Sequence, residues 1–267
     1  MKRIALLAGG GKLPLIFADR IKSGGEYVIG LAIEGLTLRG LDSRVDRIYW
    51  GDVTEVERAL EILRSEKINY IAMAGKIPKS LVFNRGLADN KIASGVFART
   101  MDSRDYTLIK MVALVLRKKG VNVLDPTPYL LPLIPKKGVM TRKAPTEAQW
   151  QDIKFGAKAA KNIAGMDIGQ AVVVKKRLVA AVEAIEGTDE TIKRAGALVG
   201  EGAVIVKVAR PRQDMRFDIP TIGPETIDAM ISAKAAALAV EAKRTLMIDR
   251  GEIIRKADAS GIVVVAI

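Results

Sequence analysis

The side chains that could carry out chemistry in this chain are almost all carboxylates and cations. Histidine and cysteine are both absent from its 267 residues. This excludes Ser-His-Asp and Cys-His nucleophiles, thiol redox chemistry and every metal site built from imidazole or thiolate. Aspartate and glutamate oxygens suit hard cations better than softer metals. We therefore expect the chemistry to depend on carboxylates and on Mg²⁺ as the cofactor.

Two stretches concentrate carboxylates next to Gly, Pro or Thr, where helices and strands tend to break. In the first, over 183–190, Glu183 and Asp189 lie on either side of Gly187, whose backbone can approach a phosphate closely. We expect this turn to form a magnesium and phosphate cradle, with Glu183 and Asp189 as metal ligands. Taken alone, Thr188 or Asp189 would more often cap the helix predicted to follow.

The second stretch, over 214–223, contains our best candidate for the catalytic residue. Asp218 lies between two apolar residues, and a carboxylate in such surroundings needs a cation or another partner. We expect Asp218 to ligate the metal or to act as the base that activates water. The alternative is an ion pair with Arg212 or Arg216.

A glycine-rich segment near the N-terminus is suited to binding a phosphate or a ribose. Residues 8–14 read Ala-Gly-Gly-Gly-Lys-Leu-Pro and fall between a predicted strand and a predicted helix, where backbone amides can receive an anion. A later strand ends at a second glycine, and its loop should emerge at the same carboxyl edge of a parallel sheet. The candidate substrate-binding residues of the two loops are Gly10, Gly11, Lys12, Leu13, Gly75 and Lys76.

Other interpretations of these residues stay open. Pro14 occupies the third glycine position of a dinucleotide-binding fingerprint, so the motif supports NAD binding only weakly. A tight glycine turn with Pro at the first helical position accounts for the same segment without a ligand. In the same way, Asp105 is a candidate substrate-binding residue and also a candidate N-cap of the helix predicted over 105–118, and the two roles do not exclude each other.

The elements that position these residues follow an α/β pattern. Apolar runs and helical periodicities alternate through the first half, as in a parallel Rossmann-like βαβ array. The predicted strands are 2–8, 26–33, 68–74 and 121–124, and the predicted helices are 13–22, 56–66 and 105–118. Prolines at positions 126, 128, 132, 135 and 145 then indicate a domain boundary.

The second half is also α/β but does not repeat the first. The predicted helices are 147–164, 190–199, 225–242 and 252–260, and the predicted strands are 171–175 and 178–184, paired as a hairpin, 203–208, 245–248 and 262–267. We therefore predict a Rossmann-like N-terminal domain over 1–135, a linker over 136–146 and a C-terminal α/β catalytic domain over 147–267.

Composition limits the partners. The 43 basic and 30 acidic residues leave a net charge of +13, which favours anionic ligands. Aromatic residues make up only 4% of the chain, so stacking platforms for bases are scarce and we expect a phosphorylated small molecule rather than nucleic acid. No apolar run reaches the roughly 20 residues of a membrane-spanning helix, so we expect a protein that is at most peripheral to a membrane.

These motifs, in this order, resemble those of the LpxI family, the magnesium-dependent UDP-2,3-diacylglucosamine pyrophosphatases of lipid A biosynthesis. The resemblance is carried by residues 8–14, by Met-Asp-Ile-Gly-Gln over 166–170, by Ala-Val-Glu-Ala-Ile-Glu-Gly-Thr-Asp over 181–189, and by the segment 207–223. The family usually has Leu where this chain has Met166. Together the motifs span nearly the whole chain.

The resemblance implies hydrolysis of the substrate's pyrophosphate to UMP and 2,3-diacylglucosamine 1-phosphate, with Mg²⁺ as cofactor. It also implies an active site in the cleft between the two domains. Asp218 matches the family's essential aspartate. Relatives often have two adjacent acids where this chain has Asp105 followed by Tyr106. The substrate-binding candidates of the C-terminal motifs are Gln170, Glu186, Gly187, Thr188 and Thr221.

A diacylated substrate resides in a membrane leaflet. We therefore expect a cytoplasmic enzyme, peripheral to the inner membrane, that touches the membrane transiently and is favoured there by its basic charge. A homodimer is a further hypothesis. The competing functions are a nucleotide-dependent Rossmann-type oxidoreductase and a non-enzymatic module that binds phosphorylated ligands or RNA, and both leave the C-terminal acids unexplained.

Overall fold

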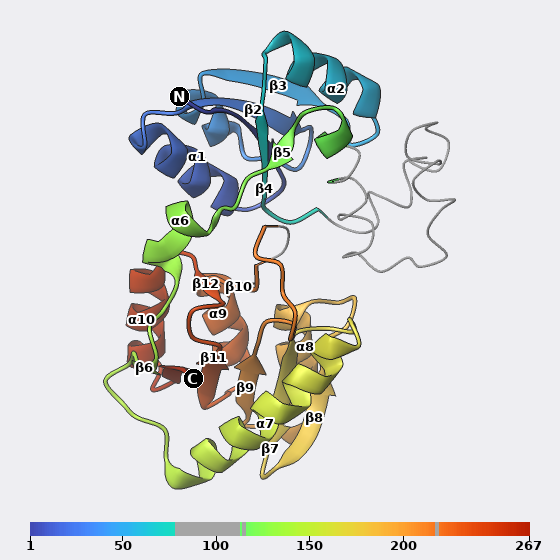
Figure 1. Ribbon diagram of the computed structural model, residues 1–267. Helices are drawn as coiled ribbons and strands as arrows, with labels where there is room; N and C mark the ends of the chain where they lie inside the picture. The colour runs from blue at the N-terminus through green and yellow to red at the C-terminus, as the bar shows by residue number, and fades with distance from the viewer. Residues whose placement is uncertain (78–112, 114–115, 217–218) are drawn as a thin grey trace. The chain divides into compact units, whose positions relative to one another are not determined.

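The structure, a computed structural model, describes residues 1–77, 113, 116–216 and 219–267 (Figure 1). The chain divides into two compact units, Met1–Leu130 and Leu131–Ile267. Within the described part of the chain, no helix combines the length and the apolar character that crossing a bilayer requires. The candidates Asp105 and Asp218, and most of the helix predicted over 105–118, lie outside the described residues.

The first unit is built on a five-stranded parallel sheet with the order β3-β2-β1-β4-β5. Its strands are β1 (Arg3–Ala8), β2 (Tyr27–Ile33), β3 (Arg47–Gly51), β4 (Tyr70–Ala74) and β5 (Asn122–Val123). Among the described residues of this unit, the helices include α1 (Leu13–Ser23), α2 (Val56–Ser65) and α6 (Thr127–Leu130), with a 3₁₀ turn over Arg39–Arg44. This arrangement confirms the predicted Rossmann-like fold.

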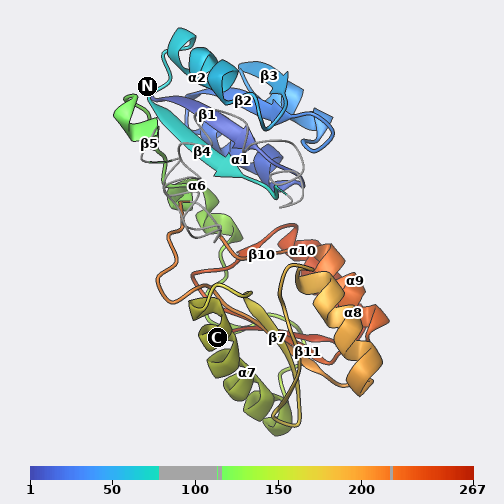
Figure 2. The ribbon, with the colours of Figure 1, turned by 90° about the vertical axis from the view of Figure 1, so that its right-hand side faces the viewer.

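Burial explains why these segments form the sheet and its layers. β1 and β2 are almost entirely buried, as expected of central parallel strands covered on both faces. Leu63 of α2 packs with Ala5, Ile29 and Ile71 on one face, while α1 covers the other (Figure 2). The predicted strands and helices before residue 75 are confirmed, but β3 was missed because its residues are only partly buried.

The second unit contains a six-stranded mixed sheet with the order β6-β13-β11-β9-β7-β8. Its strands are β6 (Gly138–Val139), β7 (Ala171–Lys175), β8 (Leu178–Val182), β9 (Val204–Lys207), β11 (Ala237–Val240) and β13 (Val263–Ala266). A small parallel pair joins β10 (Thr221–Ile222) to β12 (Leu246–Met247). Part of the predicted linker therefore forms a strand, because β6 pairs with β13.

Helices cover both faces of this sheet. They are α7 (Glu147–Gly165), α8 (Thr188–Val199), α9 (Pro224–Ser232) and α10 (Arg250–Ala259), and a 3₁₀ turn covers Leu131–Leu133. Figure 2 shows α7 on one face and α8, α9 and α10 on the other. Two hydrophobic clusters fill the layers, one under α7 and one under the other three helices. The predicted second α/β domain is thereby confirmed.

The strand directions decide which loops meet. β9, β11 and β13 are parallel, β7 is antiparallel to β9, and β8 is antiparallel to β7. The chain segments that follow β8, β9 and β11 and the segment that precedes β7 consequently share one edge. We call this the carboxyl edge of the second sheet.

The helix predicted over 225–242 is wrong in its second half. α9 ends at Ser232, the backbone adopts a positive φ of 49° at Lys234, and residues 237–240 form the fully buried strand β11. The run of alanines has a high helix propensity. Pairing with β9 and β13 on both sides outweighs that propensity, since a central strand between two helical layers accepts small side chains.

Candidate functional site

In the first unit, the two glycine loops are joined to each other by their backbones. The amide of Gly10 donates to the Lys76 carbonyl at 2.8 Å, and the amide of Lys76 donates to the Gly10 carbonyl at 3.0 Å. The two loops therefore meet at the carboxyl edge between β1 and β4, as predicted from the order of the elements. This is the switch point at which open α/β sheets place ligands.

The tight approach of the loops requires glycine at two positions. A Cβ on Gly75, where φ is +90°, would lie 2.7 Å from the Gly10 carbonyl oxygen. A Cβ on Gly9 would lie 2.6 Å from the Lys76 carbonyl oxygen. Gly9 and Gly75 thus serve loop packing, which leaves Gly11, Lys12 and Leu13, at the start of α1, as the part of this loop best placed for a ligand. Pro14 lies in the first turn of that helix, as expected.

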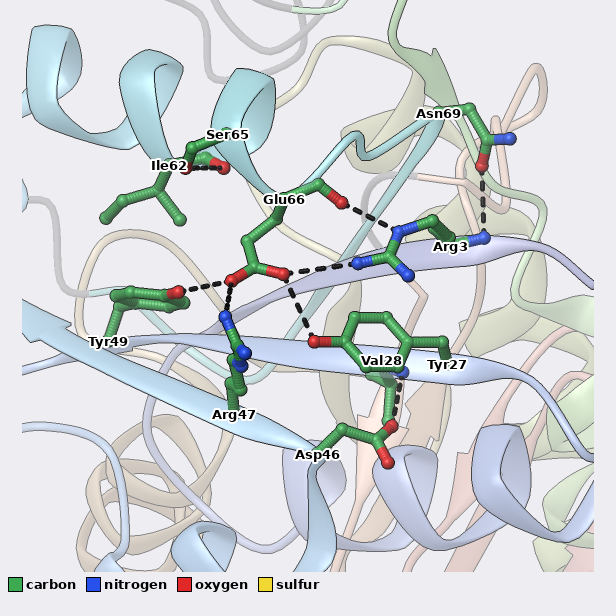
Figure 3. Close-up of polar contacts among 10 residues, drawn as sticks. All are labelled: Arg3, Tyr27, Val28, Asp46, Arg47, Tyr49, Ile62, Ser65, Glu66 and Asn69. Atoms are coloured by element: carbon green, nitrogen blue, oxygen red, sulfur yellow. Dashed lines mark hydrogen bonds and ion pairs between the residues drawn. The ribbon is translucent and has the colours of Figure 1, made fainter.

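The opposite, amino edge of the same sheet holds a different polar cluster (Figure 3). The buried Glu66 carboxylate accepts hydrogen bonds from the hydroxyls of Tyr27 (3.1 Å) and Tyr49 (2.5 Å) and from the guanidinium groups of Arg3 (3.2 Å) and Arg47 (2.7 Å). The Tyr49 hydroxyl above all, with Arg47 and Tyr27, holds the pKa of Glu66 below its ordinary value. Since four donors satisfy this carboxylate far from the glycine loops, we assign it to stability.

In the second unit, the carboxyl edge gathers a buried network of three side chains. The Thr188 hydroxyl donates to Glu183 Oε1 at 2.6 Å, and the Lys207 ammonium donates to Thr188 Oγ1 at 2.6 Å. Lys207 also lies 3.9 Å from Glu183 Oε1. The three residues come from the end of β9, the start of α8 and the loop after β8, so only the strand pairing brings them together.

Gln170 joins this network through its backbone. Its amide donates to Glu183 Oε2 at 2.9 Å, and its carbonyl accepts from the amide of Val208 at 2.8 Å. The preceding Gly169 lies so close to the Glu183 backbone that a Cβ would come within 2.0 Å of its carbonyl oxygen. Both carboxylate oxygens of Glu183 are thus engaged by hydrogen bonds. This arrangement favours a structural role for Glu183 over metal ligation.

The start of α8 differs from the capping expectation. Gly187, with a φ of +83°, is the N-cap, and no side chain caps the helix. The predicted capping by Thr188 or Asp189 is therefore wrong, since Thr188 bonds to Glu183 instead. The Asp189 carboxylate accepts from the hydroxyl of Thr226 in the first turn of α9, at 2.9 Å. This contact ties the N-termini of the two helices together.

The remaining predicted residues lie around this edge. Glu186 is exposed and pairs with Arg194 at 2.6 Å, and this guanidinium lowers the pKa of Glu186. The Thr221 hydroxyl donates to the Ile219 carbonyl at 2.8 Å. Thr221 begins β10, which follows directly on the segment that contains Asp218.

Arg216, one of the two alternative ion-pair partners of Asp218, has another acid beside it. Arg216 contacts the Asp214 carboxylate through two nitrogens, Nε at 2.9 Å and an Nη at 2.6 Å.

Across the described residues, no three acids lie close enough together to hold a metal ion. The structure thus brings Glu183, Thr188 and Gln170 together, while a cation site that includes Asp218, which lies outside the described residues, stays a prediction. The predicted cleft between the domains stays a prediction.

Lys207 is the residue whose position sequence reasoning missed. In the sequence, Lys207 stands out only as the first residue of the segment 207–223 that carries the family resemblance. The available signal was a lysine inside the otherwise apolar strand predicted over 203–208, because a charge in a buried strand needs a specific reason. An ion pair that the sequence did not indicate lies at the same edge. The Lys161 ammonium of α7 donates to the Glu241 carboxylate at 2.6 Å and to the Ala209 carbonyl at 2.8 Å.

Comparisons with known proteins cover the whole chain. The family model for the LpxI N-terminal domain matches residues 3–133, and that for the LpxI C-terminal domain matches residues 136–265. A curated relative, the UDP-2,3-diacylglucosamine pyrophosphatase LpxI of Caulobacter vibrioides, is 29% identical over 279 aligned residues. The alignment covers 100% of this chain and 98% of the relative.

Solved structures are much less similar. The biotin carboxylase domain of Hydrogenobacter thermophilus 2-oxoglutarate carboxylase is 14% identical, with a TM-score of 0.29, and the match covers 74% of this chain and 41% of that one. Phosphoribosylglycinamide synthetase from Anaerococcus prevotii is 12% identical, with a TM-score of 0.25, and the match covers 72% and 42%. TM-scores this low support no inference about ligands or activity.

Proposed function

The chain belongs to the LpxI family, since the models of both family domains match it in order along almost its entire length, and on this basis we propose that it is a UDP-2,3-diacylglucosamine pyrophosphatase of lipid A biosynthesis. The products are UMP and 2,3-diacylglucosamine 1-phosphate. The observation that carries the proposal is the full-length relative that bears this activity in its name.

The chemistry of the described residues agrees with this reaction. Water attacking a phosphoanhydride needs neutralisation of phosphate charge, in-line positioning and a base. The carboxyl edge of the second sheet supplies the Lys207 ammonium and the N-termini of α8 and α9, all of which favour anions. We assign the base to Asp218, which follows β9 in the chain and matches the family's aspartate.

We further propose that the reaction needs Mg²⁺. When bound, this ion would neutralise phosphate charge and help orient the attacking water. Protein sites for Mg²⁺ commonly use one or two carboxylates together with substrate phosphates rather than a full protein cage. The donor set therefore fits with Asp218 and Asp189 as ligands, since Glu183 is committed to Thr188 and Gln170.

A lipid-linked substrate also requires contact with a membrane surface, and we propose that this cytoplasmic enzyme docks there transiently. Three large apolar side chains, Met166, Ile168 and Ile185, are exposed beside the carboxyl edge, with Ile185 82% exposed. Gly169 lies against Glu183, so the loops that carry these side chains are adjacent. The excess of basic residues would add attraction to anionic lipid.

The direct test is phosphorus NMR of the purified protein with UDP-2,3-diacylglucosamine in detergent. We expect UMP and the lipid monophosphate to appear with Mg²⁺ and to cease forming when EDTA is added. Asp218→Asn should fold normally and lose at least about 100-fold in kcat, a typical loss for a catalytic base. Asp228→Asn, which removes an exposed ion pair of α9, is the matched control. Full activity of Asp218→Asn would reject our catalytic assignment.

A further inference from the structure

Lys207 is a lysine buried at the end of a central strand. The residue is only 8% exposed, although lysines are rarely buried without a reason. Side chains alternate along a strand, and the neighbouring Val206 faces α7. Lys207 therefore faces α8 and α9, as Ile205 does. Its ammonium lies at the border between that apolar cluster and the carboxyl edge.

The partners of this ammonium do not satisfy it. It carries three N–H donors. One donates to Thr188 Oγ1 at 2.6 Å. The Glu183 carboxylate, at 3.9 Å, is too far away for a hydrogen bond. In the part of the chain that the structure describes, the other two donors have no acceptor. A buried cation with two unused donors is suited to receive an anion.

The neighbouring hydroxyl cannot fill the same role. Thr188 has one proton to donate, and this proton goes to Glu183 Oε1. Its oxygen accepts from Lys207, so it has no donor left for a phosphate. Glu183 is itself held by the Gln170 amide. The chain of contacts thus starts at a fixed backbone amide, passes through Glu183 and Thr188, and ends by aiming the Lys207 ammonium.

From this geometry we propose that Lys207 contacts a phosphoryl oxygen of the substrate, and that Thr188 and Glu183 are positioning residues that hold its ammonium. The proposal rests on the proposed pyrophosphatase function. It assigns the phosphoryl contact to Lys207 rather than to Thr188, one of the substrate-binding candidates of the sequence analysis. α8 and α9 both begin at this edge, so their amides would add to the attraction for a diphosphate.

A double-mutant cycle tests which residue meets the phosphate. Lys207→Met should reduce kcat/KM about 100-fold, as does loss of one preorganised donor to a transition state. Thr188→Val should reduce kcat/KM about 10-fold alone but less than about 2-fold in the Lys207→Met background, because its effect acts through Lys207. Thr188→Ser, which keeps the hydroxyl, should have higher kcat/KM than Thr188→Val and approach the wild type. Additive effects would mean that Thr188 contacts the substrate itself, and would overturn the assignment.

The matched control is Lys175→Met. Lys175 ends β7 at the opposite edge of the same sheet, and its ammonium donates to the Val199 carbonyl. The Lys175→Met substitution should leave kcat/KM within about 2-fold of the wild type, as expected for a change remote from the site. Urea unfolding of each variant separates a loss of fold from a loss of the contact. If folded Lys207→Met retains wild-type kcat/KM, Lys207 is only structural and the proposal fails.

A binding measurement distinguishes failure of this proposal from failure of the proposed function. Calorimetry with inorganic pyrophosphate, in EDTA and without lipid substrate, should show at least about 10-fold weaker binding to Lys207→Met than to the wild type. Equal or absent binding in both would overturn the phosphate contact. The wild type could also bind pyrophosphate more tightly than Lys207→Met does and yet fail to hydrolyse the lipid nucleotide. That result would support the phosphate contact and reject the proposed function.

Discussion

Two buried glutamates show how the partners of a carboxylate indicate its role. Glu66 accepts hydrogen bonds from two guanidinium groups and two tyrosine hydroxyls, so its charge is fully compensated. Glu183 accepts from a neutral hydroxyl and a backbone amide, and its cation, Lys207, stays 3.9 Å away. The first arrangement is typical of a structural ion pair. The second leaves a cation available to a ligand.

At the residue scale, Glu66→Gln should destabilise the protein and alter how its stability depends on pH. Because folding lowers the pKa of Glu66, its contribution is present above the unfolded pKa of about 4.3 and is lost as pH falls through the lower folded pKa. We expect a loss of about 2 kcal/mol in the free energy of unfolding at pH 7, typical of hydrogen bonds to a charged group. Urea unfolding from pH 3 to 7 measures it.

In that series the wild-type curve should fall more steeply below pH 5 than that of the variant. Glu61→Gln, an exposed change on α2, serves as the control and should follow the wild type. Parallel curves for Glu66→Gln and the wild type would show that the carboxylate is not responsible for the pH dependence.

At the scale of elements, the first sheet depends on the contact between the loops after β1 and β4. These strands neighbour each other although other elements separate them in the sequence. The backbone pairing of Gly10 with Lys76 extends their contact beyond the strands. Glycine at positions 9 and 75 makes this approach sterically feasible. The glycine-rich motif is therefore partly a packing motif and only partly available for a ligand.

Gly75→Ala should destabilise the first unit more than the matched change Gly120→Ala. Both glycines have a φ between 80° and 90°, so an alanine would be strained at either position by about 1–2 kcal/mol. A Cβ at Gly120 would meet open space, whereas one at Gly75 would overlap the Gly9–Gly10 backbone. Overpacking of this kind costs a further 1–3 kcal/mol or so. Equal losses in the free energy of unfolding would contradict the close approach of the loops.

In the second unit, a long-range contact holds the hairpin that leads to Glu183. The Asp152 carboxylate on α7 accepts from the amides of Lys176 and Arg177, at 3.0 and 2.6 Å. Both turn residues have positive φ, as a two-residue hairpin turn requires. α7 itself begins with a capping box between Thr146 and Gln149. Local turn chemistry and a helix thus fix the direction in which β8 reaches the site.

At the scale of the whole molecule, the net charge and the exposed apolar side chains predict how the protein meets a membrane. Ile185→Ser should weaken binding to vesicles of phosphatidylglycerol and phosphatidylethanolamine several-fold, because each buried methylene contributes about 0.8 kcal/mol. Leu178→Ser is the matched control, since Leu178 is 66% exposed at the opposite end of β8. Vesicle sedimentation without substrate measures both.

Binding of the wild type should also weaken as salt rises, since the attraction between basic residues and anionic lipid is screened. Equal binding of the two variants would exclude a docking role for Ile185. The homodimer stays a hypothesis, and light scattering of the purified chain is the measurement that tests it.

The prediction of the fold succeeded where local patterns and tertiary structure agree. The alternation of apolar runs and helices predicted the Rossmann-like first domain and the hairpin of β7 and β8. It failed at residues 237–240, where alanines that favour a helix are drawn into the centre of a sheet. No local signal encodes such pairing, because the stabilisation comes from neighbours distant in the sequence.

The sequence by itself determined the kind of chemistry and the fold class. Without histidine or cysteine, only oxygen donors and cations remain, and the periodicity of apolar residues specifies an α/β chain. Only the tertiary structure decided which of these groups meet. The antiparallel β7 brings residue 170 beside Glu183, and the end of β9 places Lys207 against Thr188. Strand order and register arise from contacts between distant segments, so the sequence shows the candidate residues but not which partners they acquire.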